Sequence, residues 1–295
     1  MDKKNLPTNK HFLDTSVLRP IISGTSKYKE YFKSKFGDDP CYISNYVQME
    51  FKRSYIMSLI VFYNILDLPT IPTIGEAFAF SSNSFEKSEL KADLQIANLL
   101  ATYKLDWSEP RDKIKALEIL AAYVKRLDIK LRRQFKNIGQ NSMRCTRANV
   151  QLDIKLENSR SDLKKFVNTF DDKKTCRSKC SIDKFLLNIY QTEVSKYITE
   201  SKQLSRNTDN LGFIKIAENL EKALLEKAKV CTCDFCERIG DAVIALDAPR
   251  TMQLEHTDKS FNHLCKSINQ PHQKHPSETE IINPKSTTNK NQDEN

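Results

Sequence analysis

The sequence predicts an α/β protein in which a few short strands are separated by a large all-helical insertion. Three stretches, residues 11–13, 41–43 and 251–254, have the apolar character or the alternation of strands. Between residues 73 and 229, apolar residues instead recur with the period of an α-helix, and no strand pattern interrupts them. The chain has only 6 glycines among 295 residues, which also favours helices over a loop-rich β-sandwich.

The first strand, residues 11–13, leads directly to a carboxylate at Asp14. Open α/β sheets place their ligand sites at the carboxyl ends of their strands, so Asp14 is a candidate site residue. Its alternative role is to cap the helix that follows. Residues 27–37 then predict a short helix that ends at Gly37.

A long helix is predicted from Asn45 to about Leu66. Ser44 directly follows the strand at 41–43 and is a favourable N-cap for this helix. Glu50 lies in the second turn, where it is a second carboxylate just beyond a strand. Taken alone, Glu50 would be an ordinary surface residue of a helix.

Two further carboxylates follow near the C-terminal end. Asp241 opens an apolar run at 242–246 and should lie in the first turn of a short buried helix, whereas Asp247 is expected to be a solvated helix residue. The strand at 251–254 leads to Asp258 just past its end. A carboxylate at the edge of a core is costly to desolvate without a compensating cation, so the sequence predicts a bound metal ion.

The four acidic residues lie in motifs that resemble those of PIN-domain nucleases, the family of the VapC-like toxins. The motifs are L-D-T-S-V-L at 13–18, I-S-x-x-x-x-x-E at 43–50, G-D-A-V-I-A-L at 240–246 and H-T-D-K-S-F at 256–261. The resemblance covers residues 11–75 and 237–268, roughly a third of the chain. It implies a three-layer α/β/α sandwich around a small parallel sheet, and a divalent-metal-dependent phosphodiesterase that most often acts on RNA.

The resemblance also implies a site. Asp14, Glu50, Asp241 and Asp258 would be the catalytic residues and would ligate the metal, with Thr15 or Ser16 beside it. Carboxylate oxygens are hard ligands that suit Mg²⁺ or Mn²⁺. Unlike a compact PIN domain, which joins the second and third acids by a short helical stretch, this chain separates Glu50 from Asp241 by most of its length.

The functional expectation is an endoribonuclease that hydrolyses phosphodiester bonds, with a toxin-like or defence role. Within the family, a homodimer is common and an inhibitory protein partner often controls the enzyme. One alternative is a DNA nuclease with the same site, because metal chemistry acts on the phosphate and not on the sugar. The other alternative is a non-catalytic module of this fold that binds nucleic acid or a protein partner.

The cysteines predict a second metal site of a different kind. Cys176 and Cys180 form one pair, and Cys233 and Cys236 form a C-x-x-C turn just before Asp241. Four such thiolates can hold a structural Zn²⁺, with Cys231 as the substitute ligand. Unligated thiols in a reducing compartment are the simpler alternative, and a redox role is a third.

The net charge of +9 predicts a polyanionic partner such as nucleic acid. The densest basic stretch runs from Lys125 to Arg147, although a solvated basic helix is its simpler interpretation. The candidate nucleic-acid-binding residues are Lys125, Arg126, Lys130, Arg132, Arg133 and Lys136. Phe135 is the single aromatic residue within this stretch, which gives little support for base stacking.

The predicted organisation has four parts. They are an N-terminal part of the PIN-like domain at 1–75, a helical insertion at 76–230, a C-terminal part of the PIN-like domain at 231–268 and a disordered polar tail at 269–295. The N-terminus lacks the apolar core of a signal peptide and no apolar run is long enough for a membrane span. We therefore expect a cytoplasmic protein without membrane contact.

Overall fold

The structure is a computed structural model, and it divides the chain into two compact units. It describes residues 10–84, 90–138, 145, 148, 150–152, 163, 180–226, 233–277 and 280–281. The first unit consists of Met1–Gln48, Phe135–Thr146 and Asp172–Asn295, and the second of Met49–Gln134 and Arg147–Asp171. None of the described helices is long and apolar enough to cross a membrane.

The first unit contains a five-stranded sheet in which all neighbouring strands are parallel. Its strands, in chain order, are β1 (His11–Leu13), β2 (Cys41–Ile43), β3 (Lys136–Asn137), β4 (Gln253–His256) and β5 (His272–Lys274). Their spatial order is β3-β2-β1-β4-β5. The predicted α/β class is therefore confirmed, and β4 begins two residues later than the strand predicted at 251–254.

The order of the strands reverses beside β1. From β1 the chain adds β2 and then β3 on one side, and later adds β4 and then β5 on the other. Leu13 pairs with Glu255 in the parallel register, so β1 and β4 end at nearly the same level. In open α/β sheets, ligands bind outside the carboxyl ends of the strands at such a reversal of strand order. The fold thus marks the space beyond β1 and β4 as the place to look for a site.

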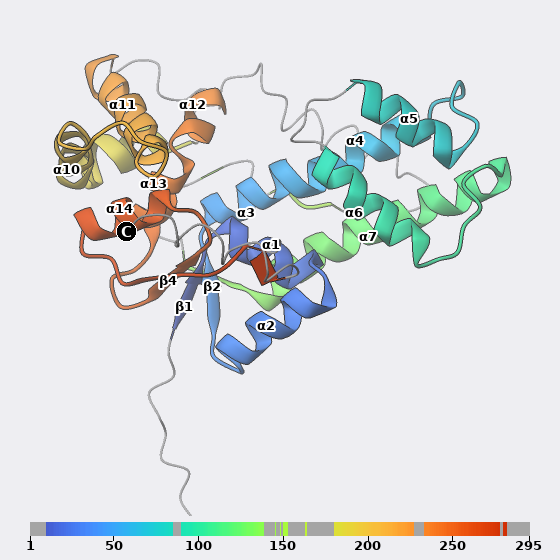
Figure 1. Cartoon of the computed structure of the whole chain (residues 1–295), viewed down its shortest axis with the longest axis horizontal. Coiled ribbons are helices and arrows are strands. Elements are labelled where there is room, and N and C mark those ends of the chain that lie inside the picture. Colours follow the sequence, from blue (N-terminus) through green and yellow to red (C-terminus); the bar gives the residue numbers. More distant parts are fainter. Residues whose placement is uncertain are drawn as a thin grey trace, which may run out of the picture. The chain divides into compact units, whose positions relative to one another are not determined.

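Helices cover both faces of this sheet (Figure 1). On one face the His11 ring lies 4.6 Å, between centroids, from the ring of Phe36 in α2 (Ser26–Phe36). On the other face the ring of His256 lies 5.0 Å from the ring of Phe261 in α14 (Ser260–Ser267). Because His11 to Leu13 are all buried, β1 lies at the centre of a helix–sheet–helix arrangement.

Along the chain, the other helices of the first unit lie between its strands. They are α1 (Thr15–Ser23), α9 (Ile182–Lys184) with the π-helix Phe185–Ile189, α10 (Gln191–Ser201), α11 (Leu211–Glu226), α12 (Cys233–Arg238) and α13 (Gly240–Asp247). Helices α10 and α11 pack on each other and on α14. As predicted, α2 ends at Gly37, which has a positive φ of 56° that a residue with a side chain rarely adopts.

The second unit is helical in its described residues. The long helix predicted from Asn45 is continuous through α3 (Asn45–Phe51), the π-helix Lys52–Ile56 and α4 (Met57–Leu66), and α3 runs from the first unit into the second. The other helices are α5 (Ile74–Ser84), α6 (Leu90–Ala101) and α7 (Pro110–Gln134). Because α4 packs on α5, α6 and α7, the unit begins at Met49 rather than at the predicted boundary after residue 75.

A buried ion pair connects α7 with the start of the second unit. The Lys52 ammonium has no exposed surface and lies 3.4 Å from Asp128 Oδ1, which is equally buried. The same ammonium donates hydrogen bonds to the main-chain oxygens of Ala148 and Val150, at 2.7 and 2.5 Å. Arg132 Nη2 lies 2.9 Å from Asp128 Oδ2. Removing either charge of a buried pair leaves the other charge buried and unpaired, which destabilises the fold. The arrangement is therefore a structural contact of the second unit.

Two short strands correct the predicted organisation. The insertion is not all-helical, because Lys136 and Asn137 form β3 at one edge of the sheet. The tail is not disordered at His272–Lys274, which form β5 at the other edge. Both strands are polar and mostly exposed, so neither carries the apolar pattern by which buried strands are identified. Main-chain pairing joins them to β2 and β4, and the His272 ring of β5 also stacks on the His256 ring of β4.

Candidate active site

Three of the four predicted acids meet where the strand order reverses. Asp14 directly follows β1, Asp258 follows β4 by two residues, and Asp241 lies in the first turn of α13. Asp14 is buried, Asp241 is half-buried and Asp258 is exposed. The three carboxylates thus form a cluster that extends from the core to the surface, which we call the aspartate cluster.

Ser16 ties Asp14 to the end of β4. The amide of Ser16 donates a hydrogen bond to Asp14 Oδ2 at 3.0 Å, and its hydroxyl donates a second bond to the same oxygen at 2.5 Å. The Ser16 hydroxyl also accepts a hydrogen bond from the amide of Thr257 at 3.1 Å. Asp14 therefore caps α1, which was its alternative role in the sequence analysis, and its carboxylate also belongs to the aspartate cluster.

Ser260 joins the other two carboxylates. Its hydroxyl lies 2.6 Å from Asp241 Oδ2 and 2.9 Å from Asp258 Oδ1, and its amide donates a hydrogen bond to Asp258 Oδ1 at 2.8 Å. A hydroxyl has one proton to donate. Both contacts are hydrogen bonds at once if Asp241 is protonated and donates to Ser260, which then donates to Asp258.

Burial and neighbouring carboxylates raise the pKa values of Asp241 and Asp14. Burial raises the pKa of Asp241 to about 7, and the negative charges of Asp14 and Asp258 add to the increase. Burial also raises the pKa of Asp14, where the charge of Asp258 acts in the same direction and hydrogen bonds from Ser16 oppose it. Among the described residues, no lysine or arginine offsets the charge on Asp241. The described surroundings of Asp241 therefore favour the neutral form of its carboxyl group.

The donor chemistry of the aspartate cluster fits a hard divalent cation. Its polar side-chain atoms are all carboxylate or hydroxyl oxygens, the type that Mg²⁺ and Mn²⁺ prefer. No group of three or more His, Cys, Asp or Glu side chains is arranged to hold a metal ion in the part of the chain that the structure describes. The side chains are instead linked through Ser16 and Ser260, so a bound cation would replace contacts that the two serines now make.

Glu50 and Thr15 were also predicted for this site, and the Thr15 amide donates a hydrogen bond to Asp14. Glu50 is half-buried on α3 and belongs to the second unit, whereas the aspartate cluster belongs to the first. Thr15 is buried at the first position of α1, directly beside Asp14. The part of Glu50 in metal binding stays a prediction.

Among the predicted zinc ligands, Cys176 and the substitute ligand Cys231 lie outside the described residues. Cys233 is described only as the first residue of α12; Cys236 is buried at the end of the same turn, and Cys180 is half-buried. Zinc binding therefore stays a prediction, and metal analysis of the purified protein tests it. We expect one zinc per chain that a chelator removes, and less than about half a zinc per chain would contradict the site.

The predicted nucleic-acid-binding residues fall into two groups. Arg132 is already paired with the buried Asp128, so its charge is neutralised within the second unit. Arg126, Arg133 and Lys136 are exposed, while Lys125 and Lys130 are half-buried. Lys136 lies on β3 in the first unit, and the other five belong to α7.

A buried acid between two histidines lies in β4, on the face of the sheet that α2 covers, and was not assigned from the sequence. Glu255 accepts hydrogen bonds from His11 Nδ1 at 2.6 Å and from His275 Nε2 at 2.7 Å, and Tyr31 contacts the other nitrogen of His275 at 3.1 Å. Burial alone would raise the pKa of Glu255, but the hydrogen bonds and charges of the two histidines outweigh it and lower that pKa. Glu255 thus joins β1, β4 and the residue after β5.

Asp247 is also buried, contrary to the expectation of a solvated position. It is 9% exposed, and neither carboxylate oxygen has a hydrogen-bond partner at ordinary distance among the described residues. Burial raises the pKa of Asp247 to about 7, although a weaker contact with the Ser44 hydroxyl opposes the shift. The apolar run of α13 continues into the core to its last residue, which takes Asp247 with it.

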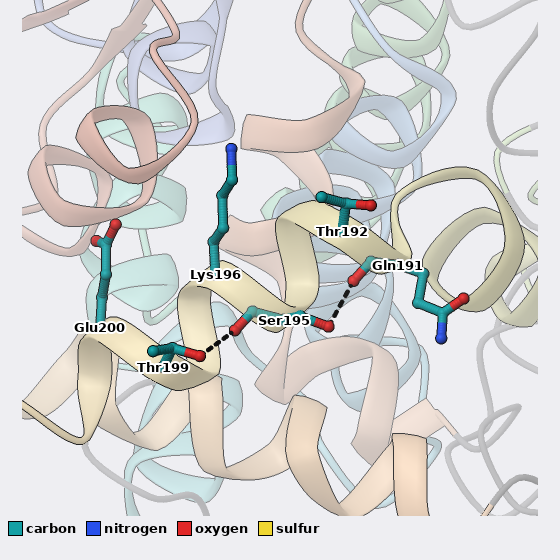
Figure 2. A pocket seen from close by; sticks show the side chains of 6 residues that line it. All are labelled: Gln191, Thr192, Ser195, Lys196, Thr199 and Glu200. Atoms are coloured by element: carbon teal, nitrogen blue, oxygen red, sulfur yellow. Dashed lines mark hydrogen bonds between the residues drawn. The ribbon is translucent and has the colours of Figure 1, made fainter.

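An open pocket of about 560 Å³ lies along α10 and contains none of the predicted site residues (Figure 2). All six residues that line it belong to this one helix. Two of its hydroxyls are already used, because Ser195 donates to the Gln191 carbonyl at 2.8 Å and Thr199 donates to the Ser195 carbonyl at 2.9 Å. It lacks the convergent polar groups of a catalytic site, which the aspartate cluster has.

No protein-family model, curated protein or solved structure matches this chain. The class of the protein is therefore described from its fold and site alone. It is an α/β protein with a parallel sheet and with acidic residues at the point where the strand order reverses.

Proposed function

We propose that this protein is a metal-dependent endoribonuclease with a PIN-like fold. The aspartate cluster carries the proposal, because three carboxylates from separate parts of the chain meet where a parallel sheet places its ligands. The helix–sheet–helix arrangement is compatible with the family's three-layer sandwich. The four acidic motifs supply the family resemblance, and the choice of RNA rests on that resemblance.

In this proposal Asp14, Asp241 and Asp258 hold Mg²⁺ or Mn²⁺. A bound ion of this kind offsets charge on a scissile phosphate and lowers the pKa of a water. Ser16 and Ser260 are positioning residues, because each fixes the direction of a carboxylate through a hydrogen bond. Asp241 must lose its proton before it can bind a cation, so metal affinity should increase as the pH rises toward about 7.

Cleavage assays with labelled RNA and DNA of the same sequence test the proposal. We expect RNA to be cut in the presence of Mn²⁺ or Mg²⁺ and to remain intact with a chelator, since the carboxylates alone cannot offset charge on a phosphate. Preferred cutting of DNA would support the alternative of a DNA nuclease. Binding of RNA without cleavage of either substrate would support the non-catalytic alternative.

The wider role proposed from the resemblance is that of a toxin-like or defence effector. An inhibitory protein partner and a homodimer belong to the same proposal. They are tested by expression with and without candidate inhibitors and by measurement of the mass in solution.

A further inference from the structure

Helix α7, which Figure 1 labels, belongs to the second unit and carries a row of three cations at helical spacing. Arg126, Lys130 and Arg133 are spaced four and three residues apart, so the helical repeat places them on the same face. Arg126 and Arg133 are exposed and Lys130 is half-buried. Burial, followed by the charge of Arg126, lowers the pKa of Lys130, which shows that the two cations are near neighbours.

In the described part of the second unit, no acid forms an ion pair with these three cations. The acid nearest to them in sequence, Asp128, is fully buried on another side of α7 and pairs with Lys52 and Arg132. With respect to the described residues, the row therefore presents unpaired positive charge at the surface of α7, which attracts a polyanion.

Aromatic side chains extend this row toward the loop between α6 and α7. Tyr123 precedes Arg126 by three residues, and its hydroxyl lies 3.3 Å from that of Tyr55. Burial and the Tyr55 hydroxyl raise the pKa of Tyr123; Arg126 opposes this increase and Tyr103 adds to it, so both lie near the Tyr123 phenol. The Tyr103 side chain is 53% exposed and makes no described ring contact.

We propose that Tyr103, Tyr123, Arg126, Lys130 and Arg133 form a binding strip for single-stranded RNA. The exposed ring of Tyr103 stacks on an unpaired base, and the three cations contact phosphates along about 10 Å of the α7 axis. A duplex keeps its bases stacked inside the helix and cannot offer one to Tyr103. The strip deepens the proposed function, on which it rests for the choice of RNA as ligand.

Two variants and two matched controls test the strip by fluorescence anisotropy with a labelled unstructured RNA. The charge variant is Arg126→Gln/Lys130→Gln/Arg133→Gln, and its control, Lys196→Gln/Lys215→Gln/Lys222→Gln, removes three exposed lysines from α10 and α11. The stacking variant is Tyr103→Ala, and its control is Tyr103→Phe, which keeps an aromatic face. All measurements are made with a chelator, so that binding is separated from cleavage.

We expect the charge variant to reduce the slope of log K against log salt by about 2 between about 50 and 200 mM, because each phosphate contact contributes roughly 0.7. Its control should leave the slope unchanged. Tyr103→Ala should weaken binding of single-stranded RNA roughly 5- to 100-fold, whereas Tyr103→Phe and binding of duplex RNA should change little. Circular dichroism should show that all four variants are folded, since the replaced side chains are on the surface or at its edge.

Wild-type affinity in both the charge and the stacking variant would overturn the strip, as would tighter binding of duplex RNA or of single-stranded DNA. Failure of the strip is distinguishable from failure of the proposed nuclease. RNA binding that depends on the strip without metal-dependent cleavage would contradict the nuclease alone. Metal-dependent cleavage with normal RNA affinity in both variants would contradict the strip alone.

Discussion

Replacing Asp14 and Asp258 together by asparagine is expected to lower metal-dependent RNA cleavage by well over 100-fold. Substitutions of residues that merely orient metal ligands cost roughly 10- to 100-fold in metal affinity or activity, so the loss of two ligands should cost more. Asparagine keeps a side-chain oxygen to accept the hydrogen bonds from the Ser16 and Ser260 amides. The variant should therefore fold, and its defect should lie in binding the cation.

The matched control for this variant is Glu221→Gln, which also removes a carboxylate from the first unit. Glu221 is paired with Lys202 at 2.7 Å on a partly exposed surface of α11, away from the aspartate cluster in sequence and in contacts. It should cleave RNA at the wild-type rate. Equal rates of cleavage by the wild type and by the double aspartate variant would show that the observed activity does not come from this site.

Much of the sheet could be predicted from the sequence because its central strands are buried. The segments 11–13 and 41–43 correspond to β1 and β2, whose apolar residues identify them. The edge strands β3 and β5 could not be identified in this way, since Lys136 and the residues around His272 face solvent. Their strand conformation follows from main-chain pairing with β2 and β4, which the local sequence does not determine.

The site could be predicted as far as its acids follow strands. The position of Asp14 and Asp258 after β1 and β4 indicates where their carboxylates lie once the strands are known to be adjacent and parallel. The bridging role of Ser260 could not be predicted, because its contact with Asp241 joins residues 19 positions apart on different helices. A hydroxyl two residues after Asp258 was the only signal available in the sequence.

The three cations of the binding strip were predicted from the sequence, but its aromatic part was missed for a similar reason. Within the basic stretch, Phe135 was the only aromatic residue, and it is buried at 7% exposure. The aromatic residue that lies near the cations is Tyr103, more than twenty residues before Arg126, and the packing of α6 and α7 against α4 and α5 is what brings the two near each other. Contacts between residues so far apart in the sequence depend on tertiary packing, and periodicity within one helix does not reveal them.

Asp241→Asn is expected to stabilise the metal-free protein above about pH 7. The folded-state pKa of Asp241 is about 7 and the ordinary value is 3.8, so between these pH values the folded chain binds a proton that the unfolded chain lacks. Stability therefore falls as the pH rises through this range, by about 2–4 kcal/mol in total. Asparagine removes this penalty and can donate its amide proton to Ser260, so at about pH 8 the Tm should increase by roughly 5–10 °C.

Asp247→Asn is the matched control, because it removes a second buried acid whose pKa is also raised to about 7 but which has no part in the aspartate cluster. Both variants should gain stability at about pH 8 and lose that gain near pH 4, where both acids are neutral in the wild type.

Mn²⁺ should then distinguish the two variants. It should raise the Tm of the wild type and of Asp247→Asn, and leave the Tm of Asp241→Asn unchanged, since a cation stabilises only the chain that binds it. A Tm of Asp241→Asn that rises with Mn²⁺ as much as that of the wild type would exclude Asp241 as a ligand, whatever happens to cleavage. A gain in stability that does not depend on pH would show that the carboxylate of Asp241 is ionised in the metal-free protein, contrary to the protonated link from Asp241 through Ser260 to Asp258.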